Sequence, residues 1–221
     1  VRMTGKTIVG GGQEAGFILE RKRPSAVRSE IEFMGTVNVQ AFDGESAWQY
    51  MPVMGMTEPE AFPPEDSKEA KEQADFDGPL MDYKTKGHTV ELVGKEQVEG
   101  ADAFKLKLTL KGGSVRHIYL DAETYLEIKM ESKRMMNGTE VETESSLSGY
   151  KEVGGLMMAH ARESGAKGSP QRQKLVIEKV ELNPEISDTI FAMPATAADT
   201  TKAAKPDSAT AAKAAAGAKA G

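Results

Sequence analysis

The sequence contains no cysteine among its 221 residues. Disulfide bonds and a thiolate nucleophile are therefore excluded, and the chain is compatible with either a reducing or an oxidising compartment. Long hydrophobic runs are also absent, because the apolar stretches are only a few residues long, whereas a membrane-spanning helix needs about 20. We therefore expect no membrane span in this chain.

An excess of positive charge is lacking as well. The chain has 28 lysine and arginine residues against 34 aspartate and glutamate residues, which gives a formal net charge of -6. A nucleic-acid-binding protein needs a clustered basic face to neutralise phosphates. We therefore expect no nucleic-acid partner.

The residue patterns of common catalytic sites are missing. No G-x-S-x-G surrounds any serine, so acyl-transfer chemistry is not supported. Glu140, Glu142 and Glu144 alternate along one face of an expected strand, which is typical of a solvated surface. Gly5-Lys6-Thr7 resembles the end of a phosphate-binding loop, but Ile8 to Gly12 cannot open the helix that such a loop needs. We therefore expect no catalytic residues, no cofactor and no enzyme activity.

The histidines are His88, His117 and His160, and each lies in a different expected strand with no second ligand at metal-binding spacing. This spacing favours three separate side chains and no metal site. The alternative is that three strands bring them together in space.

What the sequence does contain is a series of period-two segments joined by glycine turns. In Phe104 to Leu110, apolar and polar residues alternate, which indicates a strand with one dry face. The expected strands are Val1 to Val9, Phe17 to Lys22, Val27 to Phe33, Val37 to Phe42, Ala47 to Val53, His88 to Val93, Phe104 to Leu110, Val115 to Leu120, Tyr125 to Glu131, Val141 to Leu147, Leu156 to Arg162 and Lys174 to Leu182. Turns are expected at Gly10-Gly11-Gly12 and Asn137-Gly138. The pattern predicts an antiparallel meander.

The strand pattern stops between Met54 and Lys86, where several prolines exclude a central strand. Within this break, Glu65 to Phe76 has the composition of a short helix, with Pro63 and Pro64 before it. Because few of its residues are apolar, we expect this helix to lie on the surface of the sheet as a flap.

Methionine and aromatic residues gather around the same break. Met side chains adapt to irregular apolar guests, so such a lining suits a hydrophobic ligand. The alternative is that these residues only pack the flap against the sheet. Residues 195–221 differ from the rest, since they consist almost entirely of small and charged residues, and we expect a disordered Ala/Lys-rich tail.

Several short motifs occur in a characteristic order: Ala41-Phe42-Asp43-Gly44 before Trp48, the proline-rich helical insertion, Val98-Glu99-Gly100, Tyr119-Leu120-Asp121, and Phe191-Ala192-Met193-Pro194. In this order and spacing, residues 1–194 resemble the LolA-like family of outer-membrane lipoprotein-sorting proteins, which is related to LolB and RseB. The resemblance implies a mainly β (α+β) domain, a strongly curved antiparallel sheet or incomplete β-barrel with a helical lid over its concave face. The family begins with a helix before the first strand, and this chain lacks one.

The resemblance also implies a location in the periplasm or cell envelope of a bacterium, and a non-catalytic carrier that holds an acylated lipoprotein or lipid in a hydrophobic cavity. Envelope proteins would act as donor or acceptor. The alternative is an RseB-like regulatory or sensor module that binds a protein partner. The expected cavity lining is Phe17, Leu19, Ile31, Phe33, Trp48, Tyr50, Met51, Met54, Met56, Phe62 and Met81.

Overall fold

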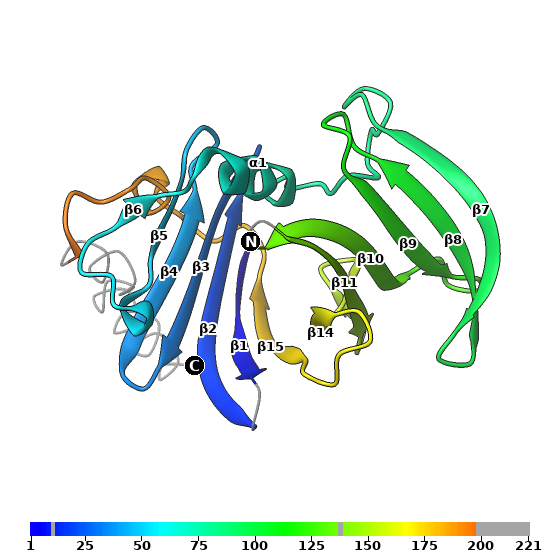
Figure 1. Cartoon of the computed structure of the whole chain (residues 1–221). Helices are drawn as coiled ribbons and strands as arrows, with labels where there is room; N and C mark the ends of the chain where they lie inside the picture. The colour runs from blue at the N-terminus through cyan, green and yellow to red at the C-terminus, as the bar shows by residue number, and fades with distance from the viewer. Residues whose placement is uncertain (10–11, 137–138, 198–221) are drawn as a thin grey trace, which may run out of the picture.

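The alternating segments form one continuous antiparallel sheet in the computed structural model, which describes residues 1–9, 12–136 and 139–197. The sheet has 13 strands in the order β6-β5-β4-β3-β2-β1-β15-β14-β11-β10-β9-β8-β7. Its strands are β1 (Arg2–Val9), β2 (Gln13–Lys22), β3 (Ala26–Phe33), β4 (Thr36–Phe42), β5 (Ala47–Tyr50), β6 (Glu60–Ala61), β7 (Thr89–Val98), β8 (Ala101–Thr109), β9 (Val115–Asp121), β10 (Glu127–Met136), β11 (Thr139–Ser148), β14 (Ala161–Ala166) and β15 (Gln173–Glu181). Figure 1 shows that the sheet is strongly curved and is not closed into a barrel.

The remaining elements are the helix α1 (Pro64–Gln73), the short 3-10 helices η1 (Pro52–Met54) and η2 (Asp188–Ile190), and a separate hairpin of β12 (Lys151–Val153) and β13 (Leu156–Met158). The expected fold class, a mainly β protein with a curved open sheet and a helix against it, is confirmed. The turns expected at Gly10-Gly11 and Asn137-Gly138, and the tail from residue 198 onward, lie outside the described residues.

Several strand and helix bounds differ from the sequence prediction. The strand expected from Ala47 to Val53 ends at Tyr50, because Pro52 begins η1. The segment expected as one strand from Leu156 to Arg162 is divided between β13 and β14, because Gly154 and Gly155 fold β13 back onto β12. The short strands β6 and β12 were not predicted. Strand β7 continues through Gly94 to Val98, with a bulge between Leu92 and Gly94. The helix begins at Pro64 and ends at Gln73, three residues earlier than expected.

The sheet has two faces, which follow from the register because directly paired residues point to the same side. We call one side the helix face, which carries Phe17, Leu19, Ile31 and Phe42. The small side chains of Ala70 and Ala74 lie against it in a cluster with Phe42, Ala47, Val27 and Phe62. Helix α1 therefore covers the sheet through alanines, which let it approach closely.

Polar contacts on two sides fix the C-terminal end of α1 over this face. Arg21 Nη2 of β2 donates a hydrogen bond of 2.7 Å to the carbonyl oxygen of Asp75, just after the helix ends. On the other side, Arg116 Nη2 of β9 lies 3.3 Å from Glu72 Oε2, and Ser114 Oγ donates to Glu72 Oε1 at 3.1 Å. The helix therefore bridges the two halves of the curved sheet.

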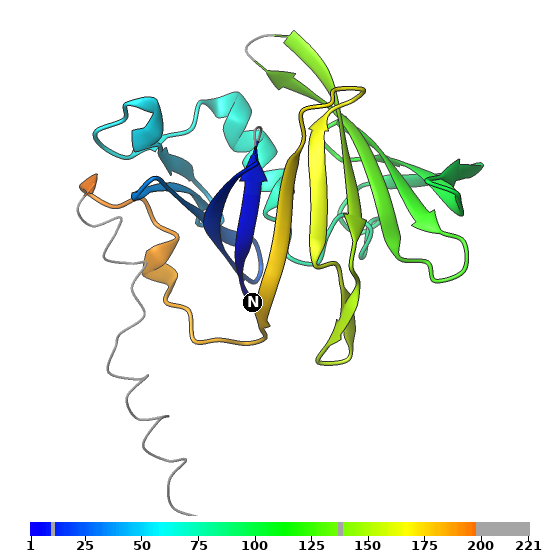
Figure 2. The ribbon, with the colours of Figure 1, turned by 90° about the horizontal axis from the view of Figure 1, so that it is seen from below.

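We call the other side the anchor face, because the segment 185–193 lies on it, opposite α1 (Figure 2). Trp48 is fully buried there beside Val39 and Ala41, and its Nε1 donates to the carbonyl oxygen of Phe191 at 2.7 Å. Arg28 Nε forms a buried ion pair with Glu30 at 2.6 Å, and its Nη1 donates to the carbonyl oxygen of Ile190 at 2.9 Å. The C-terminal segment is thus fastened through its backbone carbonyls.

One glycine is needed where the two sheet halves join. A β-carbon on Gly5 would lie 2.0 Å from the carbonyl oxygen of Val176 and 2.8 Å from the ring of Phe17. The β1–β15 ladder also shifts register between Thr4 and Gly5. The absence of a side chain at this position therefore lets Phe17 of β2 cover the bulge.

Replacing Trp48 with phenylalanine is expected to lower the free energy of unfolding by about 1–3 kcal/mol, because the carbonyl oxygen of Phe191 would stay buried without its donor. Urea denaturation followed by circular dichroism measures the change. Tyr50→Phe is the control, since it removes only the hydroxyl of a half-buried residue on the same face. If both variants unfold at the wild-type urea concentration, the indole does not anchor the segment.

Candidate ligand-binding face

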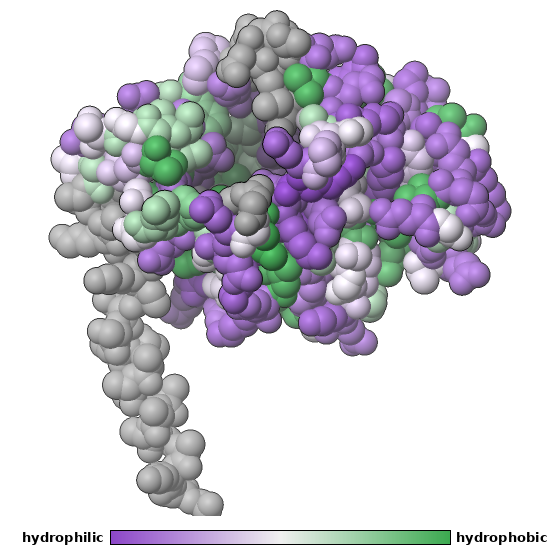
Figure 3. Space-filling model, turned by 60° about the horizontal axis from the view of Figure 1, so that its bottom comes forward, coloured by the Kyte–Doolittle hydropathy of each residue, from purple (hydrophilic) through white to green (hydrophobic). Residues whose placement is uncertain are grey.

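Half-buried apolar side chains form a continuous floor on the helix face of four neighbouring strands. The floor comprises Met3 of β1, Leu19 of β2, Ile31 of β3, and Leu175 and Ile177 of β15. Figure 3 shows a hollow on this side of the molecule, lined by residues coloured as hydrophobic. Since these side chains are neither fully buried nor fully exposed, they offer an apolar surface that a guest molecule can cover.

The helix face becomes polar toward β14 and β11. Gln173 Nε2 donates to Thr7 Oγ1 at 3.0 Å, and Ser132 and Thr143 share a hydrogen bond of 3.0 Å between their hydroxyls. Ser145 is 3% exposed, and its Oγ has no hydrogen-bond partner within the described part of the chain. The same face therefore combines an apolar floor with hydroxyl groups, which suits an amphiphilic guest.

Glu127, at the start of β10, adds a carboxyl group to this region. Burial raises its pKa, and the charges of Arg162 and Arg116 oppose that rise. Tyr150 holds the local backbone, because its hydroxyl donates to the carbonyl oxygen of Glu127 at 2.5 Å. The carboxyl therefore gains protons more readily than an exposed glutamate does.

The sequence-predicted lining residues lie in three different environments. Phe17, Leu19, Ile31 and Phe33 alternate along β2 and β3 on the helix face, so the structure brings them together. Phe62 packs beside α1, in the cluster of Phe42 and Ala74. Trp48 and Tyr50 lie on the anchor face, on the far side of the sheet from these residues.

The methionines of the predicted lining lie outside the floor. Met54 and Met81 are 76% and 58% exposed, whereas Met51 and Met56 are half-buried around η1. Sequence reasoning missed Met3, Leu175 and Ile177. Leu175, Val176 and Ile177 form an apolar run in β15, so the sequence does not show which side is dry. Only the long-range β1–β15 register shows that Leu175 and Ile177 continue the face of β2.

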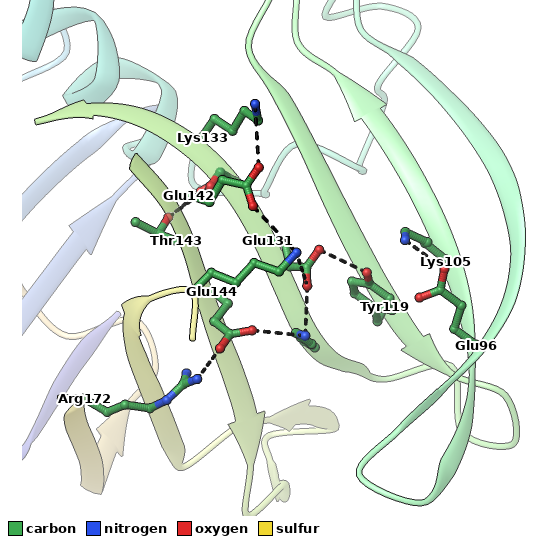
Figure 4. A network of polar contacts seen from close by, with 12 residues as sticks. Glu96, Lys105, Tyr119, Glu131, Lys133, Glu142, Thr143, Glu144 and Arg172 are labelled. Atoms are coloured by element: carbon green, nitrogen blue, oxygen red, sulfur yellow. Dashed lines mark hydrogen bonds and ion pairs between the residues drawn. The ribbon is translucent and has the colours of Figure 1, made fainter. Parts of the chain in front are cut away.

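On the anchor face of the other half, charged residues surround a second hollow of about 490 Å³, which Figure 4 shows from close by. Lys129 Nζ lies 2.9 Å from Glu131 and 3.1 Å from Glu144, and Arg172 pairs with Glu144. Tyr119 donates its hydroxyl proton to Glu131 at 3.1 Å. Lys105 Nζ, which lies 5.3 Å from the centre of the Tyr119 ring, pairs with Glu96.

The charged side chains around this second hollow form a network of ion pairs. Burial alone would raise the pKa of Glu131, but the hydrogen bond and charge of Lys129, together with Lys167, outweigh it and lower the pKa to about 2. Hydrogen bonds from Arg172 and Lys129 likewise outweigh burial and lower the pKa of Glu144. Both carboxylates are therefore held ionised by neighbouring cations.

The histidines do not meet. Nδ1 of His88 accepts a hydrogen bond from the backbone of Lys111, His117 lies opposite Glu131 in the ladder, and His160 is buried beside the carbonyl oxygen of Met158. Among the described residues, no group of three or more His, Cys, Asp and Glu side chains is placed to hold a metal ion. Nor does the described part of the chain contain a helix with the length and apolarity needed to cross a membrane.

Glu131→Gln tests the network by its pH dependence. Because the pKa of Glu131 is lower in the folded than in the unfolded state, its contribution is present above about pH 4.5 and is lost as the pH falls toward about 2. We expect the variant to lose about 1 kcal/mol of unfolding free energy at about pH 7, allowing for solvent screening. The difference from wild type should shrink on acidification in urea titrations.

Glu142→Gln serves as the control, because Glu142 is half exposed and its nearest cation lies 3.6 Å away. We expect this variant to lose less unfolding free energy than Glu131→Gln. Equal losses for the two variants at every pH would contradict a special role for Glu131.

No model of a known protein family matches the sequence, and neither does any curated protein. Solved structures do match in fold. A LolA superfamily protein from Nitrosomonas europaea aligns with a TM-score of 0.59 at 15% identity, covering 87% of this chain and 88% of that one. A domain from Vibrio parahaemolyticus named for outer membrane lipoprotein sorting gives 0.56 at 14% identity, covering 86% and 88%.

A third similar structure is a DUF1329 family protein from Desulfovibrio piger, with a TM-score of 0.60 at 13% identity and coverage of 86% of this chain and 88% of that one. All three alignments span nearly the whole described sheet, so the likeness concerns the complete architecture. At these identities it is the fold that is shared. The chain therefore has the LolA-like fold.

Proposed function

We propose that this protein is a non-catalytic carrier that holds the acyl chains of a lipoprotein or lipid on its helix face. The observation that carries the proposal is the continuous apolar floor of β3, β2, β1 and β15, which borders a hollow in a sheet with the LolA-like fold. Capture of an acyl chain needs no catalytic group, because each methylene moved from water to an apolar site contributes about 0.8 kcal/mol.

The arrangement of polar groups supports an orientation for this guest. Acyl chains would lie on Leu19, Ile31 and Ile177, and the ester or amide head would face the hydroxyl-bearing strands β11 and β14. The hydroxyl groups of the half-buried Ser132 and Thr143 would offer hydrogen bonds to a carbonyl oxygen of this head.

The structure fits a helix that opens for loading and release. Few apolar residues hold α1 on the sheet, and the polar contacts of Arg21, Arg116 and Ser114 with the helix end could be exchanged for bonds to water on opening. Following the fold, we place this carrier in the periplasm or envelope of a bacterium, where envelope proteins would deliver and receive its load. A named lipoprotein-sorting domain shares the fold and supports this placement.

Leu19→Glu tests the carrier function. A carboxylate in the apolar floor must be desolvated when an acyl chain binds, so we expect affinity for palmitate and for a synthetic diacylated lipopeptide to fall about tenfold or more. Native mass spectrometry and calorimetric titration measure the binding. Trp48 fluorescence is a poor reporter here, because the indole lies on the anchor face.

Leu156→Glu is the matched control, since Leu156 is 60% exposed on the separate β12–β13 hairpin. It should bind both probes as the wild type does. A wild-type protein that binds neither palmitate nor the lipopeptide would refute the proposal, as would equal losses of affinity in the two variants.

A further inference from the structure

A second apolar surface lies at one end of the sheet, outside the hollow. Met34, Val53 and Met54 are 85%, 57% and 76% exposed. Met34 occupies the β3–β4 turn, and η1 lies beside the start of β4, where the backbone N–H of Val53 donates to Asn38 Oδ1 at 3.4 Å. Figure 3 shows hydrophobic residues gathered at this end, on the left of the molecule. We call these three residues the methionine patch.

The backbone at Met34 is unfavourable for a methionine. The two-residue turn between Phe33 and Thr36 has positive φ angles at both positions, 51° at Met34 and 75° at Gly35. Such turns favour Asn-Gly, and a residue with a large side chain there costs about 1 kcal/mol. Because the side chain of Met34 is almost fully exposed, the fold gains no packing in return. A backbone conformation that costs free energy, with no packing to offset it, indicates that Met34 serves a role other than stabilising the fold.

Exposed carboxylates lie close to the patch along the chain. The nearest charged residues along β3, β6 and the loop after η1 are Glu32, Glu58 and Glu60, and all three are exposed. No lysine or arginine occurs in the sequence between Arg28 and Lys68. The surface therefore combines adaptable apolar side chains with an acidic border.

We infer that the methionine patch is a docking surface for a basic, amphipathic peptide segment of another protein. Flexible methionines accept apolar anchors of varied shape, and the carboxylates of Glu58 and Glu60 pair with lysine or arginine beside those anchors. An anionic lipid surface would be repelled by the same carboxylates. A second copy of this chain would bring like charges together.

The test begins with selection of a phage-displayed peptide library on the full chain, with counter-selection on a Met34→Asn, Met54→Gln double variant. We expect the enriched peptides to carry lysine or arginine beside large apolar residues. A synthetic enriched peptide should bind the double variant about tenfold more weakly than the wild type. Its affinity for the wild type should fall as salt is added, because charges are screened.

Controls separate binding from stability and from the carrier function. Met34→Asn alone should leave the urea midpoint unchanged or raise it, since asparagine tolerates positive φ. Met81→Gln changes another exposed methionine and should leave peptide affinity unchanged. Leu19→Glu should also leave it unchanged, so that failure of the carrier proposal and failure of this one give different results.

Four outcomes would overturn the inference. The enriched peptides could lack basic residues or bind the double variant as well as the wild type. The wild type, but not the double variant, could form dimers in analytical ultracentrifugation, which would identify a second copy as the occupant. Finally, patch-dependent binding to vesicles of phosphatidylcholine and phosphatidylglycerol would identify a lipid surface.

Discussion

The pairing of β1 with β15 is the interaction on which the rest of this structure depends. It joins strands from the two ends of the folded chain, with Arg2 opposite Glu181, and makes one sheet out of two meanders. Gly5 permits this junction, because the backbone of Val176 occupies the space that any side chain would need. Without this ladder, β1 to β6 would form one smaller sheet and β7 to β11 with β14 and β15 another, and no floor would run from β3 to β15.

The continuous sheet explains why its two faces have such different chemistry. In β8 the alternation sends apolar residues to the helix face and charged residues to the anchor face, as with Leu106 and Lys105. The N-terminal half buries its charged residues under the C-terminal segment, where Arg28 pairs with Glu30. The other half leaves its charges on the wall of an open hollow, where they neutralise one another. The half-buried apolar side chains of the floor therefore lie on the helix face, away from the charged network.

The sequence was sufficient for the fold class and for most strands, because period-two alternation and glycine turns are local signals. The sequence was not sufficient to predict which face of the sheet each side chain occupies. Trp48 and Leu19 were grouped as lining, yet a difference of one residue in register decides which side a strand residue occupies, and that register is set by pairing with distant strands. The prediction of a single strand from Leu156 to Arg162 was wrong for another reason. The strands β12 and β13 are too short for a period of two to be visible in the sequence.

The side chain of Asn38 lies between the methionine patch and the floor of the hollow. Asn38 accepts from the N–H of Val53 through Oδ1 and donates through Nδ2 to the carbonyl oxygen of Ile31, at 3.4 Å in each case. One side chain thus connects η1, which presents the patch, with the strand that forms the floor. A partner that pulls η1 away from β4 would break the first of these bonds and leave a polar group of Asn38 unpaired next to Ile31. Because both bonds are long, the cost of this step is small compared with the loss of a buried apolar contact. A change at η1 would therefore transmit little energy to Ile31 through this side chain.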